Sequence, residues 1–421
     1  MAPAKSRAQP GTGFLYGWLL VALFVEYARP ASQLTFLNIP YFYSIVPMSL
    51  FLVTLFAPGL RPMREVLTDR LAKWIFIMLG LTALSVVFAS VFTYSYDTFI
   101  TILGYVLLFV MISRLATSEA RIRGIILTLF IAHMYLLAMN PDALLNPEQR
   151  NYIDGATFLG DGNDFALSLC ILLPLMVELG LSRRGIGRYL AWGGALVVVF
   201  AIIATQSRGG TLGLLAVIAY LWWRSPRKLP AALGICVLVA AALIYAPDAY
   251  FTRMRTMAAS ERDGSAQGRI DAWKGAIGMG IKNPILGIGT RHFGTRWGMT
   301  AHSTYFLAFA ELGLPGLICV LVLIFGNIRE NGRLRSRLFA RAGPESEVSV
   351  GGSARLLDML TAGMIGYAVA GAFLSAAYHP HLFLLTGLMI SARVLAAQRL
   401  HGRTQRESGA YASAAAARRI S

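Results

Sequence analysis

Long apolar runs separated by short clusters of basic residues are the feature of this sequence that most restricts its fold. Runs such as Gly193 to Thr205 and Leu317 to Phe325 contain no charged residue. Charged residues make up only 14% of the chain, against roughly 25% in soluble domains, and 56% of the residues are hydrophobic. Because a helix that spans a bilayer needs about 20 mostly apolar residues, we predict an all-α, polytopic membrane protein with about twelve spanning helices.

The predicted spans are residues 14–28, 37–57, 74–94, 98–113, 122–139, 164–181, 189–205, 209–223, 229–246, 303–325, 356–375 and 381–398. They form one membrane domain over 13–399, between a tail at 1–12 and a basic tail at 400–421, and we expect both tails to be disordered. We expect no cleavable signal peptide, because the segment after Arg7 runs directly into the first span.

The distribution of Lys and Arg predicts the orientation, because these residues accumulate in cytoplasmic loops. If the spans alternate, both termini lie on one face together with the larger share of the 38 Lys and Arg residues. The short loops of the opposite face carry only Arg29, Arg150 and Arg208, while its long loop 247–302 is basic. We therefore expect both termini to be cytoplasmic. The net charge of +17 reflects this topology and does not indicate nucleic-acid binding.

Several classes of protein are disfavoured by motifs that the sequence lacks. Cys170, Cys236 and Cys319 fall within apolar spans, so we expect buried thiols and no disulfides. There is no glycine-rich phosphate loop of Walker or Rossmann spacing, and no His/Cys cluster with metal-ligand spacing, so we expect no cofactor. An internal repeat is also lacking, which argues against a transporter built from inverted repeats.

The predicted outer loop 140–163 is acidic and rich in turn residues. It leads into Asp161-Gly162-Asn163-Asp164, which looks like the start of a calcium-binding loop. The bidentate glutamate that such a loop needs at its twelfth position is replaced by Leu172. We therefore expect Asn163 or Asp164 to cap the sixth span.

The predicted outer loop 247–302 is the longest segment between spans. Residues 248–259 and 269–282 have the spacing of short amphipathic helices, which could lie on the outer leaflet with their basic residues toward lipid head groups. Residues 287–298 are rich in glycine and basic residues. The loop ends at His302, directly before the tenth predicted span.

Arg208 lies in a turn of only a few residues, Gln206-Ser207-Arg208-Gly209-Gly210, between two predicted spans. A guanidinium held there can bind an anionic head group through a planar, bidentate fork. The alternative is an arginine that extends its charge into water and marks the membrane interface. We favour a functional role, because the other short outer loops carry little positive charge.

Arg269 and His302 are the next candidates. Arg269 could bind an anion, or it could be a solvated residue that pairs with Asp271. His302 precedes a predicted span, where the helix dipole and nearby arginines disfavour the charged imidazolium. A neutral histidine is a competent general base, and a capping or packing role is the alternative.

Three more ionisable residues fall near predicted spans. Glu311 lies further into the tenth span and, in a regular helix, faces away from His302. A carboxylate at that depth indicates a functional site, or it satisfies a helix turn broken by Gly313-Leu314-Pro315-Gly316. His379 and His381 flank Pro380 in a short outer turn, where interface residues are more common than metal ligands.

Taken in order, these motifs resemble those of the bacterial O-antigen ligase family. The resemblance rests on Ser207-Arg208-Gly209, Gly268-Arg269 with Trp273, Asn283-Pro284-Ile285-Leu286-Gly287-Ile288-Gly289, Ala301-His302-Ser303-Thr304-Tyr305 and Ala310-Glu311-Leu312-Gly313-Leu314-Pro315-Gly316. Together they cover roughly residues 205–320, and the segment Asp161 to Ala166 and the topology extend the likeness over most of the chain. Many relatives have Asn where this chain has Ser303.

The resemblance implies a GT-C-like membrane fold and a metal-independent, inverting glycosyltransferase that needs no cofactor. The donor would be a glycan linked to undecaprenyl diphosphate, and the acceptor a sugar hydroxyl of the lipid A-core, in lipopolysaccharide biosynthesis. Arg208 and Arg269 would bind the donor diphosphate, and His302 would activate the acceptor. Further residues that we expect to line the site are Gln206, Asn163, Arg291, Ser303 and Tyr305.

We expect the site on the periplasmic face of the bacterial inner membrane, where the donor lipid can enter from the bilayer. Relatives that polymerise glycan repeats or glycosylate proteins supply two alternatives within the same superfamily. A transporter or flippase of lipid-linked glycans is the alternative from another class, but it should line a path with charges on several spans. The expected partners are the lipid-linked glycan, a glycan acceptor and membrane lipids, and not nucleic acid.

Overall fold

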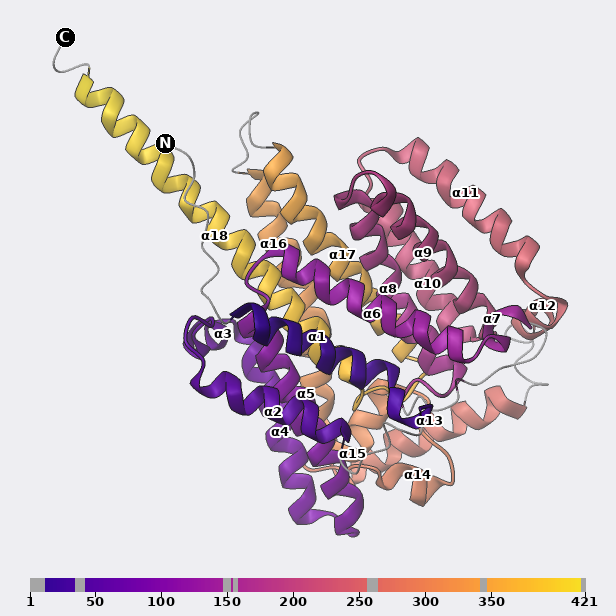
Figure 1. The fold of residues 1–421 in the computed structure, drawn as a ribbon. Helices are drawn as coiled ribbons and strands as arrows, with labels where there is room; N and C mark the ends of the chain where they lie inside the picture. Colours follow the sequence, from indigo (N-terminus) through magenta and orange to yellow (C-terminus); the bar gives the residue numbers. More distant parts are fainter. Residues whose placement is uncertain are drawn as a thin grey trace.

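The computed structural model describes residues 12–34, 42–146, 153, 158–255, 264–340 and 347–417. Within these ranges the regular secondary structure is helical (Figure 1). The helices are α1 (Thr12–Ala28), α2 (Phe42–Phe56), α3 (Met63–Thr68), α4 (Arg70–Phe88), α5 (Phe92–Leu115), α6 (Glu119–Met139), α7 (Asp142–Leu145), α8 (Gly162–Ser182), α9 (Ile186–Ala204), α10 (Arg208–Arg224), α11 (Lys228–Tyr245), α12 (Asp248–Arg255), α13 (Gly264–Lys282), α14 (His292–Trp297), α15 (Thr304–Leu321), α16 (Asn327–Ala340), α17 (Glu347–Gly371) and α18 (Pro380–Ala417). A single π-helical turn at Val322–Gly326 joins α15 to α16.

Among the described residues, eight segments are long and apolar enough to cross a membrane, judged by their length and composition. They are α4, α5, α6, α8, α9, α11, the continuous stretch Thr304–Ala340, and Pro380–Leu400 of α18. Helices α1, α2 and α10 are shorter, with 17, 15 and 17 residues. The prediction of an all-α polytopic membrane protein is confirmed, and the count of twelve spans stays a prediction.

One pair of predicted boundaries is wrong. The sequence predicts spans at 74–94 and 98–113, whereas α4 ends at Phe88 and α5 already begins at Phe92. The Asp69 carboxylate accepts the backbone N–H of Leu71 at 2.9 Å and caps α4, so the helix starts at Arg70. The chain leaves the helix at Ala89, whose backbone is extended (φ −72°, ψ 143°), and the last aromatic residues of the predicted span form the first turn of α5.

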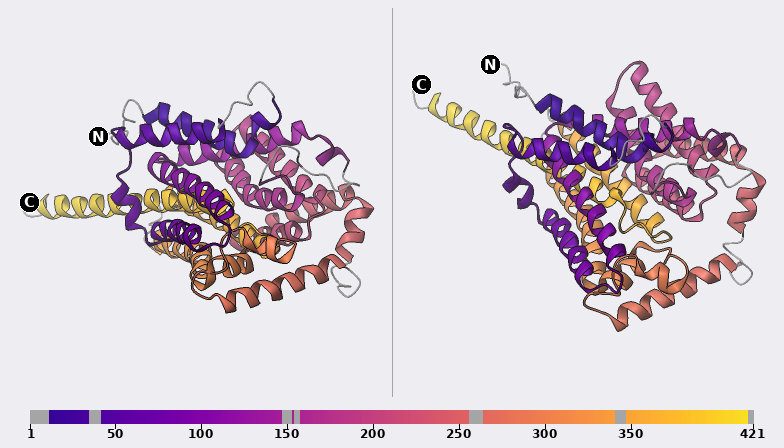
Figure 2. Two further views of the ribbon diagram at one scale, coloured as in Figure 1. Left: turned by 90° about the horizontal axis from the view of Figure 1, so that it is seen from below. Right: turned by 60° about the horizontal axis from the view of Figure 1, so that its bottom comes forward.

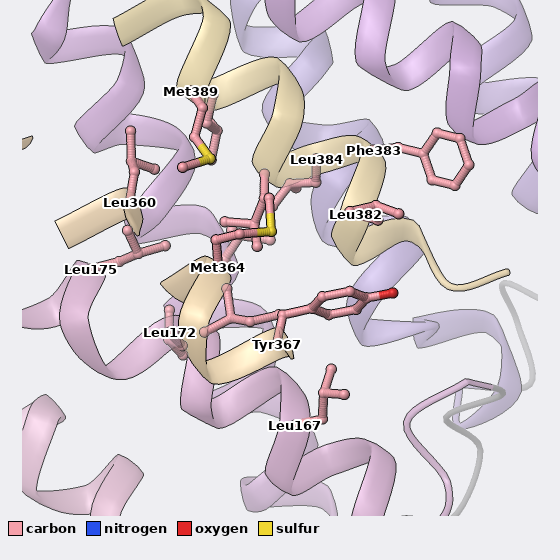
Figure 3. Close-up of a cluster of buried hydrophobic side chains, with 14 of the residues drawn as sticks. Leu167, Leu172, Leu175, Leu360, Met364, Tyr367, Leu382, Phe383, Leu384 and Met389 are labelled. Carbon is pink, nitrogen blue, oxygen red and sulfur yellow. The ribbon is translucent and has the colours of Figure 1, made fainter. Parts of the chain in front are cut away.

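Helix α8 lies at the centre of the bundle, packed between α9, α10 and α17. Figure 3 shows leucines of α8 in a buried cluster with side chains of α17 and α18, Tyr367 among them. The helices approach closely because small residues lie between them. A Cβ atom on Gly213 of α10 would lie 3.1 Å from both Ala370 Cβ and Cys170 Sγ. This close packing fixes the ends of α10 and α17 relative to α8.

Helix α11 lies at the periphery, next to α9 and α10, and has no buried residue (Figure 1). This corrects one prediction, because Cys170 and Cys319 are buried whereas Cys236 of α11 is exposed. A hydrophobic residue in a membrane helix can face lipid as well as the protein core, so hydropathy does not distinguish the two positions.

Ion pairs hold one end of the bundle, which we call the ionic end. They join Arg123 and Arg355 to Glu178, Arg224 and Arg335 to Asp358, and Arg393 to Asp69, with N···O distances of 2.7–3.0 Å. Because Arg224 ends α10 and Arg208 begins it, the ionic end lies opposite the turn at 205–207. We call the end that holds this turn the site end. The ionic end is the one that the charge distribution predicts to be cytoplasmic.

The loop 247–302 contains α12, α13 and α14, as the amphipathic spacing predicts for its first two helices. Figure 2 shows α13 along the edge of the molecule, next to α15, against which it packs. The predicted disorder of the tail 400–421 is wrong as far as the structure describes it. Helix α18 continues to Ala417 and projects beyond the bundle (Figure 1).

Candidate functional site

The turn between α9 and α10 presents Arg208 as the first residue of a helix. Gln206 turns the chain with a left-handed backbone, φ 50°, and its side chain is buried. Ser207 then caps α10, since its hydroxyl accepts the backbone N–H of Gly210 at 3.1 Å. Arg208 therefore begins α10 at the positive end of the helix dipole, a position that is suited to an anion.

The first turn of α8 holds the turn at 205–207 in place. Ser207 Oγ donates a hydrogen bond of 2.8 Å to Asn163 Oδ1, and Asn163 N donates one of 2.7 Å to Asp161 Oδ1. Asp161 is therefore the N-cap of α8, and the prediction that Asn163 or Asp164 caps this helix is wrong. The helix begins at Gly162, two residues before the predicted span 164–181, so the cap moves with it.

Two glycines after Arg208 allow α10 to pack tightly at the site end. A Cβ atom on Gly210 would lie 2.5 Å from Ala166 Cβ on α8, so only glycine fits there without a shift. A Cβ atom on Gly209 would lie 3.1 Å from Phe373 Cβ, in the segment that joins α17 to α18. The start of α10 is thus pressed between α8 and residues 372–379, which we call the 372–379 segment.

Helix α13 reaches the same place through Trp273. The Trp273 ring lies 6.2 Å from the Phe373 ring and 5.6 Å from the Phe306 ring of α15, measured between centroids. Arg269 precedes Trp273 by one helical turn, so the two residues share a face of α13. Phe373 therefore contacts both the helix that begins at Arg208 and the helix that carries Arg269.

His302 directly precedes the N-cap of α15 and has a left-handed backbone, φ 46°. Its N–H donates to Thr300 Oγ1 at 3.3 Å, and Thr300 Oγ1 also bonds to Ser375 Oγ. Thr304 Oγ1 donates to Leu374 O at 2.8 Å and accepts the N–H of Ala376 at 3.1 Å. The 372–379 segment therefore also holds the start of α15 beside His302.

Two predicted lining residues are engaged in the packing of α15. Ser303 is its N-cap, with Oγ 3.4 Å from the N–H of Phe306, and its side chain is buried. The hydroxyl of Tyr305 donates to Ala368 O on α17 at 2.8 Å. Both residues lie within three positions of His302 in the chain, and both fix the helix start through their polar atoms.

The structure thus brings the turn of Arg208, the face of Arg269 and the start of α15 together around Phe373. The sequence singles out His379 in the 372–379 segment but not Phe373 or Ser375, although the segment supplies most of the contacts that join these elements. A signal was present, because Ser375 and Tyr378 are further polar or aromatic residues in this short loop between two apolar spans.

Comparison with known families addresses the same region. Residues 193–321 match the family model described as O-Antigen ligase. The chain carries an O-antigen ligase domain. The match runs from α9 to the end of α15 and includes Arg208, Arg269 and His302. It supports the resemblance to the O-antigen ligase family that the motifs indicated. No curated protein matches the chain.

Within the O-antigen ligase domain, the Glu311 side chain is buried and hydrogen-bonds to backbone groups. Its two carboxylate oxygens accept the backbone N–H groups of Arg291 and Phe293, each at 2.9 Å. Helix α15 is broken just after it, where Gly313 has φ 68° and ψ −164°. Leu314 N then donates to Pro284 O at 2.8 Å. Of the two interpretations, the structure favours the broken helix turn. Glu311 then satisfies backbone N–H groups of residues 284–293, which pack against the break in α15 and which we call the inserted segment.

Arg291 belongs to that inserted segment. Its backbone is left-handed, φ 60°, and its N–H is held by the Glu311 carboxylate. The Arg291 side chain is exposed. What the structure fixes at this position is the backbone, and the prediction that Arg291 lines the site stays a prediction.

Outside the O-antigen ligase domain, His379 and His381 lie beside α8. His379 Nδ1 is 3.6 Å from Asp164 Oδ1, and burial lowers the pKa of His379 to about 4. His381 is buried, which differs from the interface position expected for it. Across the described ranges, no group of three or more His, Cys, Asp or Glu side chains is arranged to hold a metal ion.

Proposed function

We propose that this protein is a glycosyltransferase of the bacterial inner membrane that moves a glycan from undecaprenyl diphosphate to a sugar hydroxyl of the lipid A-core. This is the O-antigen ligase reaction of lipopolysaccharide biosynthesis. One observation carries the proposal. The helix start with Arg208, the face of α13 with Arg269 and the start of α15 after His302 converge on Phe373.

In this proposal Arg208 and Arg269 bind the diphosphate of the donor. When the bond between the anomeric carbon and the phosphate oxygen breaks, the electron pair leaves with the diphosphate. Two guanidinium groups and the N-terminus of α10 would stabilise that developing charge, in a site that is largely shielded from water. Guanidinium groups can perform this task without a metal ion, which agrees with a metal-independent reaction.

His302 would act on the acceptor. The acceptor hydroxyl oxygen attacks the anomeric carbon from the face opposite the diphosphate, so the configuration inverts. The hydroxyl proton passes to the His302 imidazole and then to solvent. The left-handed backbone of His302, held by Thr300, supports a fixed position for the ring just outside α15.

The reaction would take place on the periplasmic side, with both termini cytoplasmic. The donor lipid would reach the site end from the bilayer, since its isoprenoid chain stays in the membrane. The ion pairs and basic residues of the ionic end support a cytoplasmic location for that end, opposite the site.

Two relatives of this reaction are kept as alternatives. A polymerase would use a second lipid-linked glycan as the acceptor, and an O-oligosaccharyltransferase would use a protein hydroxyl. A flippase, from another class, would need polar groups along the bundle between both ends. Among the described residues, the ion pairs that join two helices lie instead at the ionic end, which favours chemistry at a surface over transport.

A reconstituted reaction tests the proposal. Purified protein in lipid nanodiscs would receive undecaprenyl-diphosphate glycan and lipid A-core, without added metal or nucleotide. We expect transfer that falls at least about 100-fold in Arg208→Ala and His302→Ala. Arg296→Ala is the matched control, because Arg296 is exposed on α14 and should leave transfer unchanged. Full activity in both site variants would contradict the assignment, and extension of the donor alone would identify a polymerase.

A further inference from the structure

A group of polar atoms without hydrogen-bond partners lies beside the proposed site. Within the described residues, the hydroxyl of Tyr27, Nδ1 of His379 and both ring nitrogens of His381 are buried and make no hydrogen bond. Buried polar atoms are nearly always paired, because an unpaired one has lost its hydrogen bonds to water without gaining others. His133, in the same cluster, follows this rule and bonds to Leu129 O and Ser168 Oγ, each at 2.7 Å.

Asp164 lies at the accessible edge of this group. Its side chain is 18% exposed, and that of His379 is 17% exposed. The 3.6 Å between Asp164 Oδ1 and His379 Nδ1 is too long for a direct hydrogen bond, so the partly exposed Asp164 carboxyl group keeps its hydrogen-bonding capacity for a hydroxyl group that reaches it from outside. Within the described residues no side chain or backbone group donates a hydrogen bond to the Asp164 carboxylate.

An aromatic ring completes the arrangement. The Phe158 ring centroid lies 5.8 Å from that of His379 and 5.6 Å from that of His381. A carboxylate that accepts, an imidazole that accepts or donates, and an apolar ring face match the hydroxyl groups and C–H faces of a sugar.

The position of Asp164 indicates which sugar. Asp164 follows Asn163, whose side chain accepts a hydrogen bond from Ser207, the residue before Arg208. If Arg208 holds the donor diphosphate, the group next to it is the sugar bonded to that diphosphate. We propose that Asp164, His379 and Phe158 form the subsite for this first sugar of the lipid-linked donor. The proposal rests on the proposed function and adds the part of the site that recognises the glycan.

Binding experiments with two kinds of lipid, with and without a sugar, test this proposal independently of the proposed function. Full-length protein in nanodiscs would be titrated with undecaprenyl diphosphate, and with the same lipid carrying a single hexose or N-acetylhexosamine. We expect at least one sugar-bearing lipid to bind wild-type protein more tightly than the bare lipid. Asp164→Asn should lower the affinity for that lipid about 10-fold and change the affinity for the bare lipid by no more than about two-fold. Arg208→Ala should lower the affinity for both lipids.

Control variants distinguish a sugar contact from a structural one. Asp97→Asn changes an exposed carboxylate on α5 and should alter neither affinity. His379→Asn keeps a polar atom near the position of Nδ1 and should retain part of the gain from the sugar, whereas His379→Ala should lose it. Melting temperatures would be recorded for each variant. If Asp164→Asn does not fold, the comparison of His379→Asn with His379→Ala tests the subsite in its place.

Two results would overturn the subsite. The first is that wild-type protein binds no sugar-bearing lipid more tightly than bare undecaprenyl diphosphate. The second is that Asp164→Asn lowers the affinity for the sugar-bearing and the bare lipid equally, or lowers neither. The proposed function fails separately, if wild-type protein binds no lipid diphosphate or if Arg208→Ala binds both lipids as wild-type protein does.

Discussion

Ser207 Oγ and Asn163 Oδ1 share a 2.8 Å hydrogen bond that fixes the start of α10 to the start of α8. In Asn163→Ala the Ser207 hydroxyl loses this acceptor, although it still accepts the N–H of Gly210. A hydrogen bond of this kind contributes about 1 kcal/mol, so we expect the KM for the lipid donor to rise about five-fold. Steady-state kinetics of purified protein measures this effect.

The control for that variant is Asn283→Ala. The Asn283 amide is exposed and donates only to Met279 O within its own helix region, at 3.0 Å. Its loss should leave the KM for the donor unchanged. An unchanged KM in Asn163→Ala as well would show that the turn at Arg208 does not depend on α8.

Gly287 is a second test, because the inserted segment crosses α15 there. Its φ is 67°, and a Cβ atom would overlap the backbone of Glu311. We expect Gly287→Ala to destabilise the protein by about 2–4 kcal/mol and to lower its melting temperature. Gly278→Ala is the matched control, since that helical glycine has open space around it and should be neutral or slightly stabilising. Equal melting temperatures for both variants would contradict the close crossing.

Glu311→Gln tests whether the buried carboxylate is structural. The amide keeps one acceptor for the N–H groups of Arg291 and Phe293 and turns an N–H₂ group toward the other. We expect a loss of about 1–3 kcal/mol of stability, with transfer activity per folded molecule reduced less than five-fold. Melting curves and active-site titration give the two quantities. A fully stable but inactive variant would instead assign Glu311 to the chemistry.

The orientation can be tested by labelling in cells. In a variant without native cysteines, we expect Ser265→Cys on α13 to react with a membrane-impermeant thiol reagent once the outer membrane is permeabilised. Arg184→Cys, in the loop between α8 and α9 at the ionic end, should react only after the inner membrane is opened. Labelling of position 184 before position 265 would reverse the predicted topology.

The helices and the motifs of the domain could be predicted from the sequence, because both are local. Apolar runs predict the helices, because backbone N–H and C=O groups in lipid must bond to one another and a helix satisfies them all. Arg208 could be singled out because the other short outer loops carry little positive charge. The distinction between core and lipid-facing residues could not be predicted in the same way. Cys170 and Cys236 lie in equally apolar sequence, yet only Cys170 is buried.

The rest of the candidate site depends on contacts between distant parts of the chain. Hydrophobic periodicity predicts a regular helix through Glu311, and only the left-handed Gly313 and the inserted segment show why the carboxylate is there. The role of Phe373 could not be predicted from the sequence either. Its neighbours are Gly209 and Trp273, and no local pattern relates a loop near the end of the chain to either residue.

The place of the 372–379 segment in the chain has a consequence for how the protein is made. Synthesis proceeds from the N-terminus, so Arg208, Arg269 and His302 are all in place before this segment leaves the ribosome. A nascent chain that ends after α16 contains the whole matched domain, but it lacks Phe373 and the partners of Thr304. If the proposed function holds, activity is therefore the last property that the growing chain acquires, and a premature stop before residue 372 leaves every family motif present in a protein that lacks the contacts joining them.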